Sequence, residues 1–388
     1  MSLRRRESAW ALVLVLPAMV ALSGCSMCPH APPPVDWSAL LPNAEVVPLD
    51  RGGFALHVPA TRTDPRGRVF VLVHGFPGSP LDFVGLAKAM ASGSDEFWVL
   101  SAPGHGGAPA PGSAWGLEHE PHETRHASVA RPVVPDTRWR FKLPQYTDWL
   151  RSFLRRPELA SRRVVIVAHS VGAEIVANVL APPTGADDPE LPRVNELVLL
   201  NPWLPSLCAA RVPWSSRDML SFLLPASVVA NYGPAAGDGA FGQMFFDDAS
   251  EVAASYRQQQ DRLTICRDCR RYFPEFVALV QATNAEQYRV AGVHGYTASR
   301  RAAVKQWLGD PNDPASPTTE RPRCLLIQSR HDRLFGPEYS AEVGESVVGG
   351  WQLQDRDAIV LSRSSHMVQV ERADDIAEII SRWLDGNR

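Results

Sequence analysis

Short apolar runs alternate with amphipathic stretches along most of the chain, and this alternation predicts the fold. Apolar runs bounded by polar or turn residues predict strands over 46–49, 54–58, 68–73, 97–101, 163–168, 195–200, 324–328 and 358–361. Apolar positions at helical spacing predict helices over 80–91, 145–155, 171–180, 337–348 and 373–384. Strands such as 68–73 (RVFVLV) are apolar on both faces, as expected in a parallel sheet covered by helices on both sides. The pattern predicts an α/β fold with a mostly parallel central sheet flanked by helices.

One long segment departs from this alternation. Residues 203–305 contain prolines, aromatic residues and helical stretches, but no clear strand. Because they lie between the predicted strands 195–200 and 324–328, we interpret them as a helical cap inserted into the domain. The start of the cap, 203–224, is strongly apolar. We expect most of these side chains to pack on the domain beneath, with one or two lining a pocket.

The first 25 residues have the pattern of an export signal. Arg4, Arg5 and Arg6 precede an apolar run over 9–22, which ends in the tetrapeptide LSGC at 22–25. This ending resembles the bacterial lipobox, in which the cysteine receives a diacylglyceryl group and the chain is cut before it. An ordinary secretory signal with a chance cysteine, or an uncleaved N-terminal helix, is the alternative. The resemblance implies a lipoprotein signal peptide over 1–24 and lipidation of Cys25.

The segment after Cys25 contains five prolines between residues 29 and 42. We therefore expect a lipidated, proline-rich tether over 25–44 and one domain over 45–388. By resemblance to enterobacterial sorting, Ser26 in place of an aspartate favours the outer membrane. The expected location is the cell envelope, with the chain lipid-anchored on the periplasmic face of the outer membrane.

Composition narrows the class of protein further. The chain has 388 residues, 45% hydrophobic and 21% charged, which excludes disorder throughout. Its formal net charge is −3, and removal of residues 1–24 leaves 36 basic against 41 acidic residues, or −5. This balance gives no support for a nucleic-acid partner. No uninterrupted run of 18 apolar residues exists, so a polytopic membrane protein is excluded, and six cysteines are too few for a disulfide scaffold.

The strongest chemical signal is the pentapeptide AHSVG at 168–172, which follows a predicted buried strand and opens a predicted helix. A strand–turn–helix with small residues two before and two after a serine is the context of a nucleophile elbow, and it places Ser170 as the candidate nucleophile. A small-residue turn into an ordinary helix is the alternative. We interpret His169 as a packing residue.

Residues 74–78 (HGFPG) follow another predicted buried strand and could supply a backbone donor for an oxyanion. We expect the oxyanion hole to consist of the N–H groups of Phe76 and of Val171, the residue after the nucleophile. A loop that merely turns the chain is the alternative.

The base and its orienting acid are expected later in the chain, in the order serine, acid, histidine. Asp332 lies just past the predicted strand 324–328, and His366 just past 358–361, so both share a sheet edge with Ser170. The cap therefore precedes the strand that carries the acid. His331 would point to the other side of the chain, and Glu371 and Asp374 follow His366 too closely. Glu338 is the remaining substitute acid.

Together these motifs resemble an α/β-hydrolase fold serine hydrolase of the carboxylesterase, monoacylglycerol-lipase and serine-aminopeptidase kind. The resemblance rests on residues 74–78 (HGFPG), 102–106 (APGHG), 168–172 (AHSVG), Asp332 and 364–366 (SSH). It implies hydrolysis of an ester, thioester or amide without a cofactor. A serine at position 170 argues against the epoxide-hydrolase and dehalogenase branches, whose nucleophile is an aspartate.

We expect a carboxylesterase or lipase that acts on a small-molecule ester or lipid substrate. An acyltransferase or serine aminopeptidase on the same fold, and a non-catalytic lipoprotein binding module, are the alternatives. The histidine-rich stretch 118–126 and the CxxC at 266–269 match no established metal or redox motif in context, so we expect no metal site.

Overall fold

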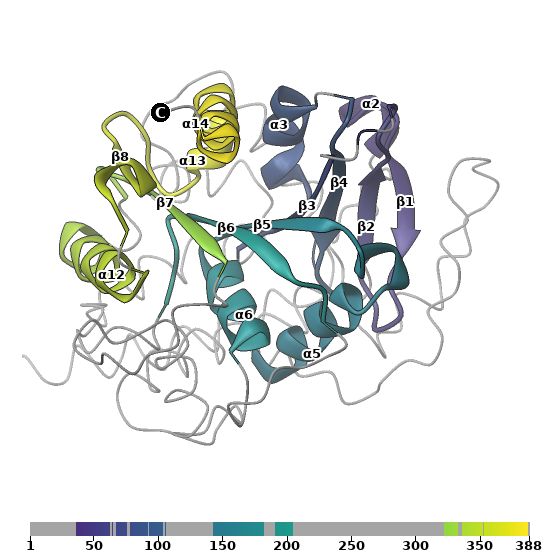
Figure 1. Cartoon of the computed structure of the whole chain (residues 1–388), viewed down its shortest axis with the longest axis horizontal. Coiled ribbons are helices and arrows are strands. Elements are labelled where there is room, and N and C mark those ends of the chain that lie inside the picture. The colour runs from purple at the N-terminus through teal and green to yellow at the C-terminus, as the bar shows by residue number, and fades with distance from the viewer. Residues whose placement is uncertain are drawn as a thin grey trace, which may run out of the picture.

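The computed structural model describes residues 36–62, 64, 67–75, 78–91, 93–103, 105, 143–181, 191–204, 322–332, 336–351 and 353–386 (Figure 1). The expected signal peptide with Cys25, the expected oxyanion residue Phe76, the stretch 118–126 and the expected cap beyond residue 204 lie outside these ranges. Expectations that fall on them remain predictions.

The described residues form an eight-stranded sheet in the order β1-β2-β4-β3-β5-β6-β7-β8. The strands are β1 (Glu45–Pro48), β2 (Phe54–Val58), β3 (Arg68–Val73), β4 (Glu96–Ser101), β5 (Arg163–His169), β6 (Val194–Leu200), β7 (Arg323–Ser329) and β8 (Ala358–Leu361). β2 pairs antiparallel with β1 and β4, whereas all pairings from β4 through β3 to β8 are parallel. The predicted mostly parallel sheet is confirmed.

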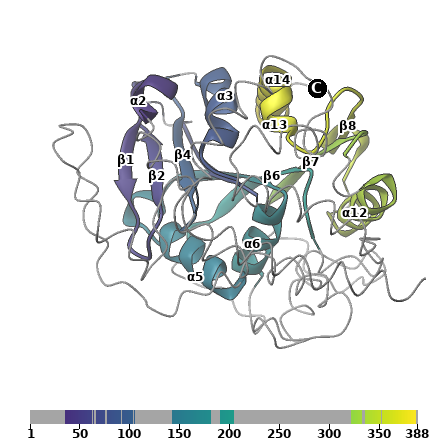
Figure 2. The same ribbon diagram turned by 180° about the vertical axis from the view of Figure 1, so that it is seen from behind.

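Helices cover both faces of the sheet (Figures 1 and 2). They are α2 (Trp37–Leu40), α3 (Leu81–Met90), α5 (Leu143–Leu154), α6 (Val171–Leu180), α12 (Gly336–Trp351), α13 (Val368–Glu371) and α14 (Ala373–Asp385), with short 3₁₀ turns at Pro157–Leu159 and Asp355–Asp357. α5, α6 and α12 pack on one face, and α3, α13 and α14 on the other.

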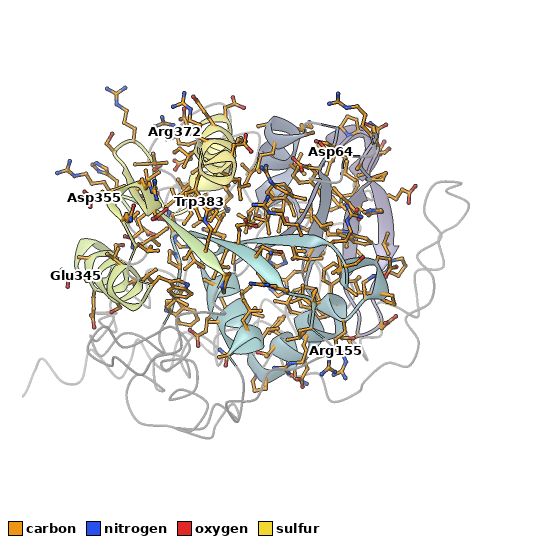
Figure 3. The ribbon with its side chains drawn as sticks, in the orientation of Figure 1. Asp64, Arg155, Glu345, Asp355, Arg372 and Trp383 are labelled. Carbon is orange, nitrogen blue, oxygen red and sulfur yellow. The ribbon has the colours of Figure 1, made fainter. Side chains whose placement is uncertain are left out.

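The core explains why the strands are apolar without alternation. In β3, Val69, Val71 and Val73 pack with α5 and α6, while Phe70 and Leu72 pack with α3 and α14. Residues 69–73 of β3 are thus buried on one face or the other, as a doubly covered parallel sheet requires. Charged side chains such as Arg155, Glu345 and Asp355 lie at the outside (Figure 3).

The sequence pattern placed the start of the domain at residue 45, but the folded domain begins earlier. Trp37 and Leu41, assigned to the tether over 25–44, are buried, and the Trp37 ring lies 5.7 Å from the ring of Phe54. Asp36 caps α2 by accepting a hydrogen bond from the N–H of Ala39 at 3.1 Å. Burial of these two apolar side chains, in a stretch with no periodicity, draws residues 37–44 onto the domain.

In the part of the chain that the structure describes, no helix combines the length and the apolar character needed to cross a membrane.

Candidate active site

Ser170 occupies a strained turn between β5 and α6. Its backbone has φ 51° and ψ −125°, a left-handed region that a residue with a side chain rarely adopts. The turn is tight because α6 starts directly against β3. A Cβ on Gly172 would lie 2.6 Å from the carbonyl oxygen of Val73 and 2.7 Å from that of His74, so only glycine fits there. This is the strand–turn–helix geometry of a nucleophile elbow.

The segment after β6 holds the backbone of Ser170. The N–H of Ser170 donates to the carbonyl oxygen of Leu200 at 3.1 Å, and the carbonyl of Ser170 accepts from the N–H of Trp203 at 3.0 Å. Ser170 is buried. The strained turn is therefore fixed from the neighbouring strand as well as from its own helix.

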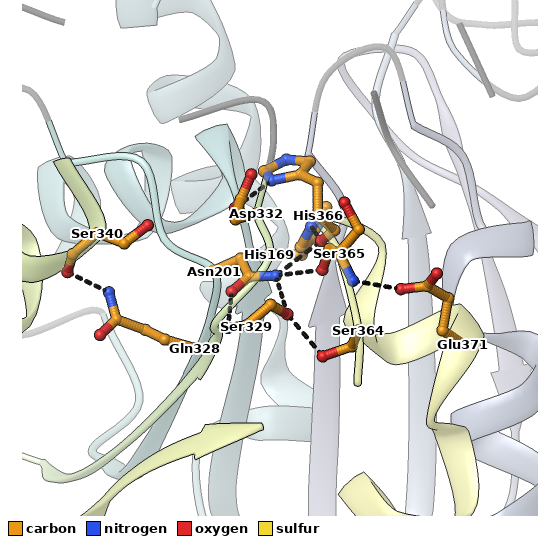
Figure 4. A network of polar contacts seen from close by, with 10 residues as sticks. All are labelled: His169, Asn201, Gln328, Ser329, Asp332, Ser340, Ser364, Ser365, His366 and Glu371. Carbon is orange, nitrogen blue, oxygen red and sulfur yellow. Dashed lines mark hydrogen bonds and ion pairs between the residues drawn. The ribbon is translucent and has the colours of Figure 1, made fainter. Parts of the chain in front are cut away.

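His366 and Asp332 form a buried pair at the same edge of the sheet (Figure 4). Nδ1 of His366 lies 2.8 Å from Oδ2 of Asp332, and the two side chains are 1% and 2% exposed. Asp332 follows β7, and His366 follows β8. Since Nδ1 faces the carboxylate, it carries the proton, and Nε2 is the nitrogen that can accept one.

Other residues competed with Asp332 and His366 for these roles in the sequence. His331 lies as the sequence predicted, and Glu371 has another hydrogen-bond partner. His331 is exposed although its neighbour Asp332 is buried. The carboxylate of Glu371 accepts a hydrogen bond from the N–H of Ser365 at 2.6 Å. The structure thus joins Asp332, and not Glu371, to the imidazole of His366. The side chain of the substitute acid Glu338 lies outside the described residues.

Sequence reasoning missed the contribution of Asn201 and underrated that of His169. Nδ2 of Asn201 and Nε2 of His169 both donate to the carbonyl oxygen of His366, each at 2.9 Å. The available signal for Asn201 was its position: it follows a buried strand at the edge that carries Ser170. Nothing local indicated its partner.

The loop that was expected to hold the oxyanion is anchored by a buried histidine. Nδ1 of His74 donates to the carbonyl of Gly75 at 2.6 Å, and its Nε2 accepts from the N–H of Ala102 at 3.1 Å. Burial lowers the pKa of His74 to about 4, so this ring is neutral at pH 7. The ring of His105 lies 5.1 Å away, and burial lowers its pKa to about 3.

The far side of the loop is anchored at the start of α3. The N–H of Ser79 donates to Oδ1 of Asp82 at 3.2 Å, and the N–H of Leu81 donates to Oγ of Ser79 at 3.2 Å. Phe76 lies between these anchors, outside the described residues. Val171 is the first residue of α6, and the first amides of a helix have no partner within it.

Within the described ranges, no group of histidine, cysteine, aspartate and glutamate side chains is placed to hold a metal ion. Cys324 is a buried thiol on β7, and burial raises its pKa, as expected for a core residue.

The chain is similar to a known family in sequence and to known structures in fold. A family described as "Alpha/beta hydrolase family" matches residues 70–379. Curated proteins give no sequence match. Similar solved structures include Cfl2 from Burkholderia cenocepacia, 17% identical over 88% of this chain and 95% of that chain with a TM-score of 0.57. An esterase from Exiguobacterium antarcticum is 11% identical over 88% and 99%, with a TM-score of 0.54. A bacterial membrane phospholipase A is 14% identical over 99% of both chains, with a TM-score of 0.51.

At these identities the solved structures establish a common fold, while the family match covers most of the sequence. The chain belongs to the alpha/beta hydrolase family.

Proposed function

We propose that the protein is a serine hydrolase that cleaves a carboxylic ester, with Ser170 as nucleophile, His366 as base and Asp332 as its orienting acid. The observation that carries this proposal is the buried 2.8 Å contact between His366 Nδ1 and Asp332 Oδ2, at the sheet edge where Ser170 occupies a strained turn. A carboxylate that holds an imidazole by Nδ1 orients Nε2 to take a proton from a hydroxyl.

In the proposed reaction, Oγ of Ser170 bonds to the acyl carbon while its proton passes to Nε2 of His366. The imidazolium then gives this proton to the departing alcohol as the ester C–O bond breaks. Water attacks the acyl-enzyme, loses its proton to His366 and releases the acid, and the proton returns to Ser170. Asp332 stabilises the imidazolium at each stage. The N–H groups of Val171 and Phe76 are the proposed donors to the oxyanion.

The choice of an ester as substrate rests on this site and on the names of two proteins with a similar structure. One is named an esterase and the other a phospholipase A. These likenesses are of fold, so the substrate of this chain needs its own test.

That test is hydrolysis of p-nitrophenyl esters of increasing acyl length, comparing the wild-type chain with Ser170→Ala. We expect ester cleavage that disappears in the variant, and full activity in Ser170→Ala would overturn the assignment. Wild-type cleavage of aminoacyl amides but not of esters, or transfer to an added alcohol in preference to water, would move the function to an aminopeptidase or an acyltransferase.

We also propose that the mature chain is a lipoprotein anchored through Cys25 to the periplasmic face of the outer membrane. The support is the lipobox-like end of the N-terminal apolar run, LSGC at 22–25. Mass spectrometry of the N-terminal peptide, with detergent-phase partitioning, tests it. We expect an acylated Cys25 and a detergent-phase protein that becomes aqueous in Cys25→Ala. An unmodified Cys25 in protein recovered from the membranes of the expressing cells would exclude the anchor.

A further inference from the structure

His366 is held by its backbone as well as by its ring. Its carbonyl oxygen accepts one hydrogen bond from Nε2 of His169 and one from Nδ2 of Asn201, both at 2.9 Å (Figure 4). All three residues are at most 3% exposed. His169 directly precedes Ser170, and Asn201 follows β6. Two donors from the ends of different strands therefore converge on one atom of the proposed base.

The amide of Asn201 has a defined orientation. Its Oδ1 accepts from the N–H of Ser329 at 2.7 Å, which fixes Nδ2 on the opposite side. Nδ2 then lies 2.8 Å from Oγ of Ser329 and 2.9 Å from the carbonyl oxygen of Ser365, in addition to the His366 carbonyl. Three acceptors share two amide hydrogens, so the donor capacity of Asn201 is fully used.

The backbone of Asn201 is itself in an uncommon conformation. Its φ is 38°, in the left-handed region that asparagine tolerates better than most residues. A strained backbone persists when the surrounding contacts determine it. Here those contacts are the end of β7 and the loop that carries His366.

The neighbours of Asn201 in sequence hold the nucleophile. Leu200 accepts from the N–H of Ser170, and Trp203 donates to its carbonyl. The segment Leu200–Trp203 thus bonds to the backbone of Ser170 at both ends and to the carbonyl of His366 in between. His169 adds a second link, because it is covalently joined to Ser170 and hydrogen-bonded to His366.

His169 can act in this way only as a donor. Its Nε2 faces a carbonyl oxygen and must carry a hydrogen. Burial, with a further contribution from the neighbouring His366, holds the pKa of His169 well below its ordinary value. A neutral ring protonated at Nε2 supplies a hydrogen bond to the His366 backbone and no positive charge beside the base.

We propose that Asn201 and His169 are positioning residues that fix the base His366 relative to the nucleophile Ser170 by binding its carbonyl oxygen. The inference rests on the proposed function. A displacement of a reacting group by about 1 Å costs on the order of a hundredfold in rate. Loss of either donor should therefore lower kcat and leave KM nearly unchanged, since neither side chain is assigned to substrate binding.

The experiment measures the rate at which a fluorophosphonate labels Ser170, together with kcat and KM on a p-nitrophenyl ester. His169→Phe keeps an aromatic ring but removes the donor, whereas His169→Gln keeps an N–H donor near the position of Nε2. Asn201→Ala removes the other donor. Asn178→Ala is the matched control, because it removes a buried amide that donates to the carbonyl and carboxylate oxygens of Glu174 within α6.

We expect His169→Phe and Asn201→Ala to slow labelling and kcat by roughly ten- to a hundredfold, with KM little changed. His169→Gln should recover most of the lost rate, and Asn178→Ala should be labelled at the wild-type rate. Wild-type labelling rates in both donor-removing variants, or equal rates in His169→Gln and His169→Phe, would overturn the proposal.

The His169 pair keeps the proposal testable if Asn201→Ala does not fold. A wild-type chain that the probe fails to label would refute the proposed function itself. That outcome differs from a labelled wild type with unaffected variants, which would refute only the positioning role.

Discussion

Two buried histidines, His74 at the start of the HGFPG loop and His105, make the folded state sensitive to acid. Burial lowers the pKa of His74 from 6.5 to about 4 and that of His105 from 6.5 to about 3. Between pH 6.5 and these values the unfolded chain binds a proton on each ring that the folded chain does not. Stability therefore falls as the pH falls through this window, by about 1.4 kcal/mol per pH unit for each histidine.

For His105 the window reaches down to about pH 3, so two pH units within it cost about 3 kcal/mol, against typical domain stabilities of about 5–15 kcal/mol. The variant His105→Asn tests whether burial lowers the pKa of His105 in the folded chain. The amide can take over the contact of Nδ1 with the carbonyl of Pro103, now 3.1 Å long, without binding a proton. The dependence of unfolding free energy on pH, between pH 6 and 4.5, should become shallower by about 1.4 kcal/mol per pH unit.

Urea unfolding at several pH values, followed by tryptophan fluorescence, measures this slope. Phe70→Ala is the control, because it removes stability without removing an ionisable group and should shift every point equally. An unchanged slope in His105→Asn would mean that the folded protein protonates His105 as readily as the unfolded chain does, and the burial argument would be refuted.

Three further predictions concern the site and the core. Asp332→Asn should lower kcat on esters by ~10⁴-fold, because the amide favours the wrong tautomer of His366, and a near-normal kcat would contradict the role of the acid. Gly75→Ala would place a Cβ 2.7 Å from the Cβ of Ser170, so fluorophosphonate labelling should slow by roughly a hundredfold; labelling at the wild-type rate would be inconsistent with the close approach. Phe70→Ala, at a fully buried ring stacked 5.0 Å from that of Phe97, should cost about 3–5 kcal/mol in urea unfolding, and a loss below about 1 kcal/mol would exclude that packing.

Most of the sheet could be predicted because its central strands are buried on both faces. The run 68–73 is apolar at nearly every position, and β3 occupies those residues. α2 and α13 could not be predicted, since each has four residues and too little length for a periodic pattern. Trp37 lies in a stretch that its prolines made resemble a tether, and only the surface it covers on the sheet shows that it belongs to the domain.

The order of the candidate site residues along the chain was predictable, but the contacts that hold them were not. Ser170, Asp332 and His366 each follow an apolar run, so the sheet edge they share could be inferred. The hydrogen bond from His169 to the His366 carbonyl joins residues 197 positions apart, and no local pattern encodes such a contact. The same is true of Asn201, because its hydrogen bond to His366 forms only when β6, β7 and the loop after β8 lie side by side.

The proposed function requires Ser170 to be a nucleophile activated by the His366–Asp332 pair. Incubation of the folded wild-type chain with a fluorophosphonate, followed by mass spectrometry of its peptides, is the sharpest test of this requirement. We expect one covalent adduct, located on Ser170 and missing from both Ser170→Ala and heat-unfolded protein. An unmodified Ser170 in the folded chain, or an adduct on another residue, would contradict it.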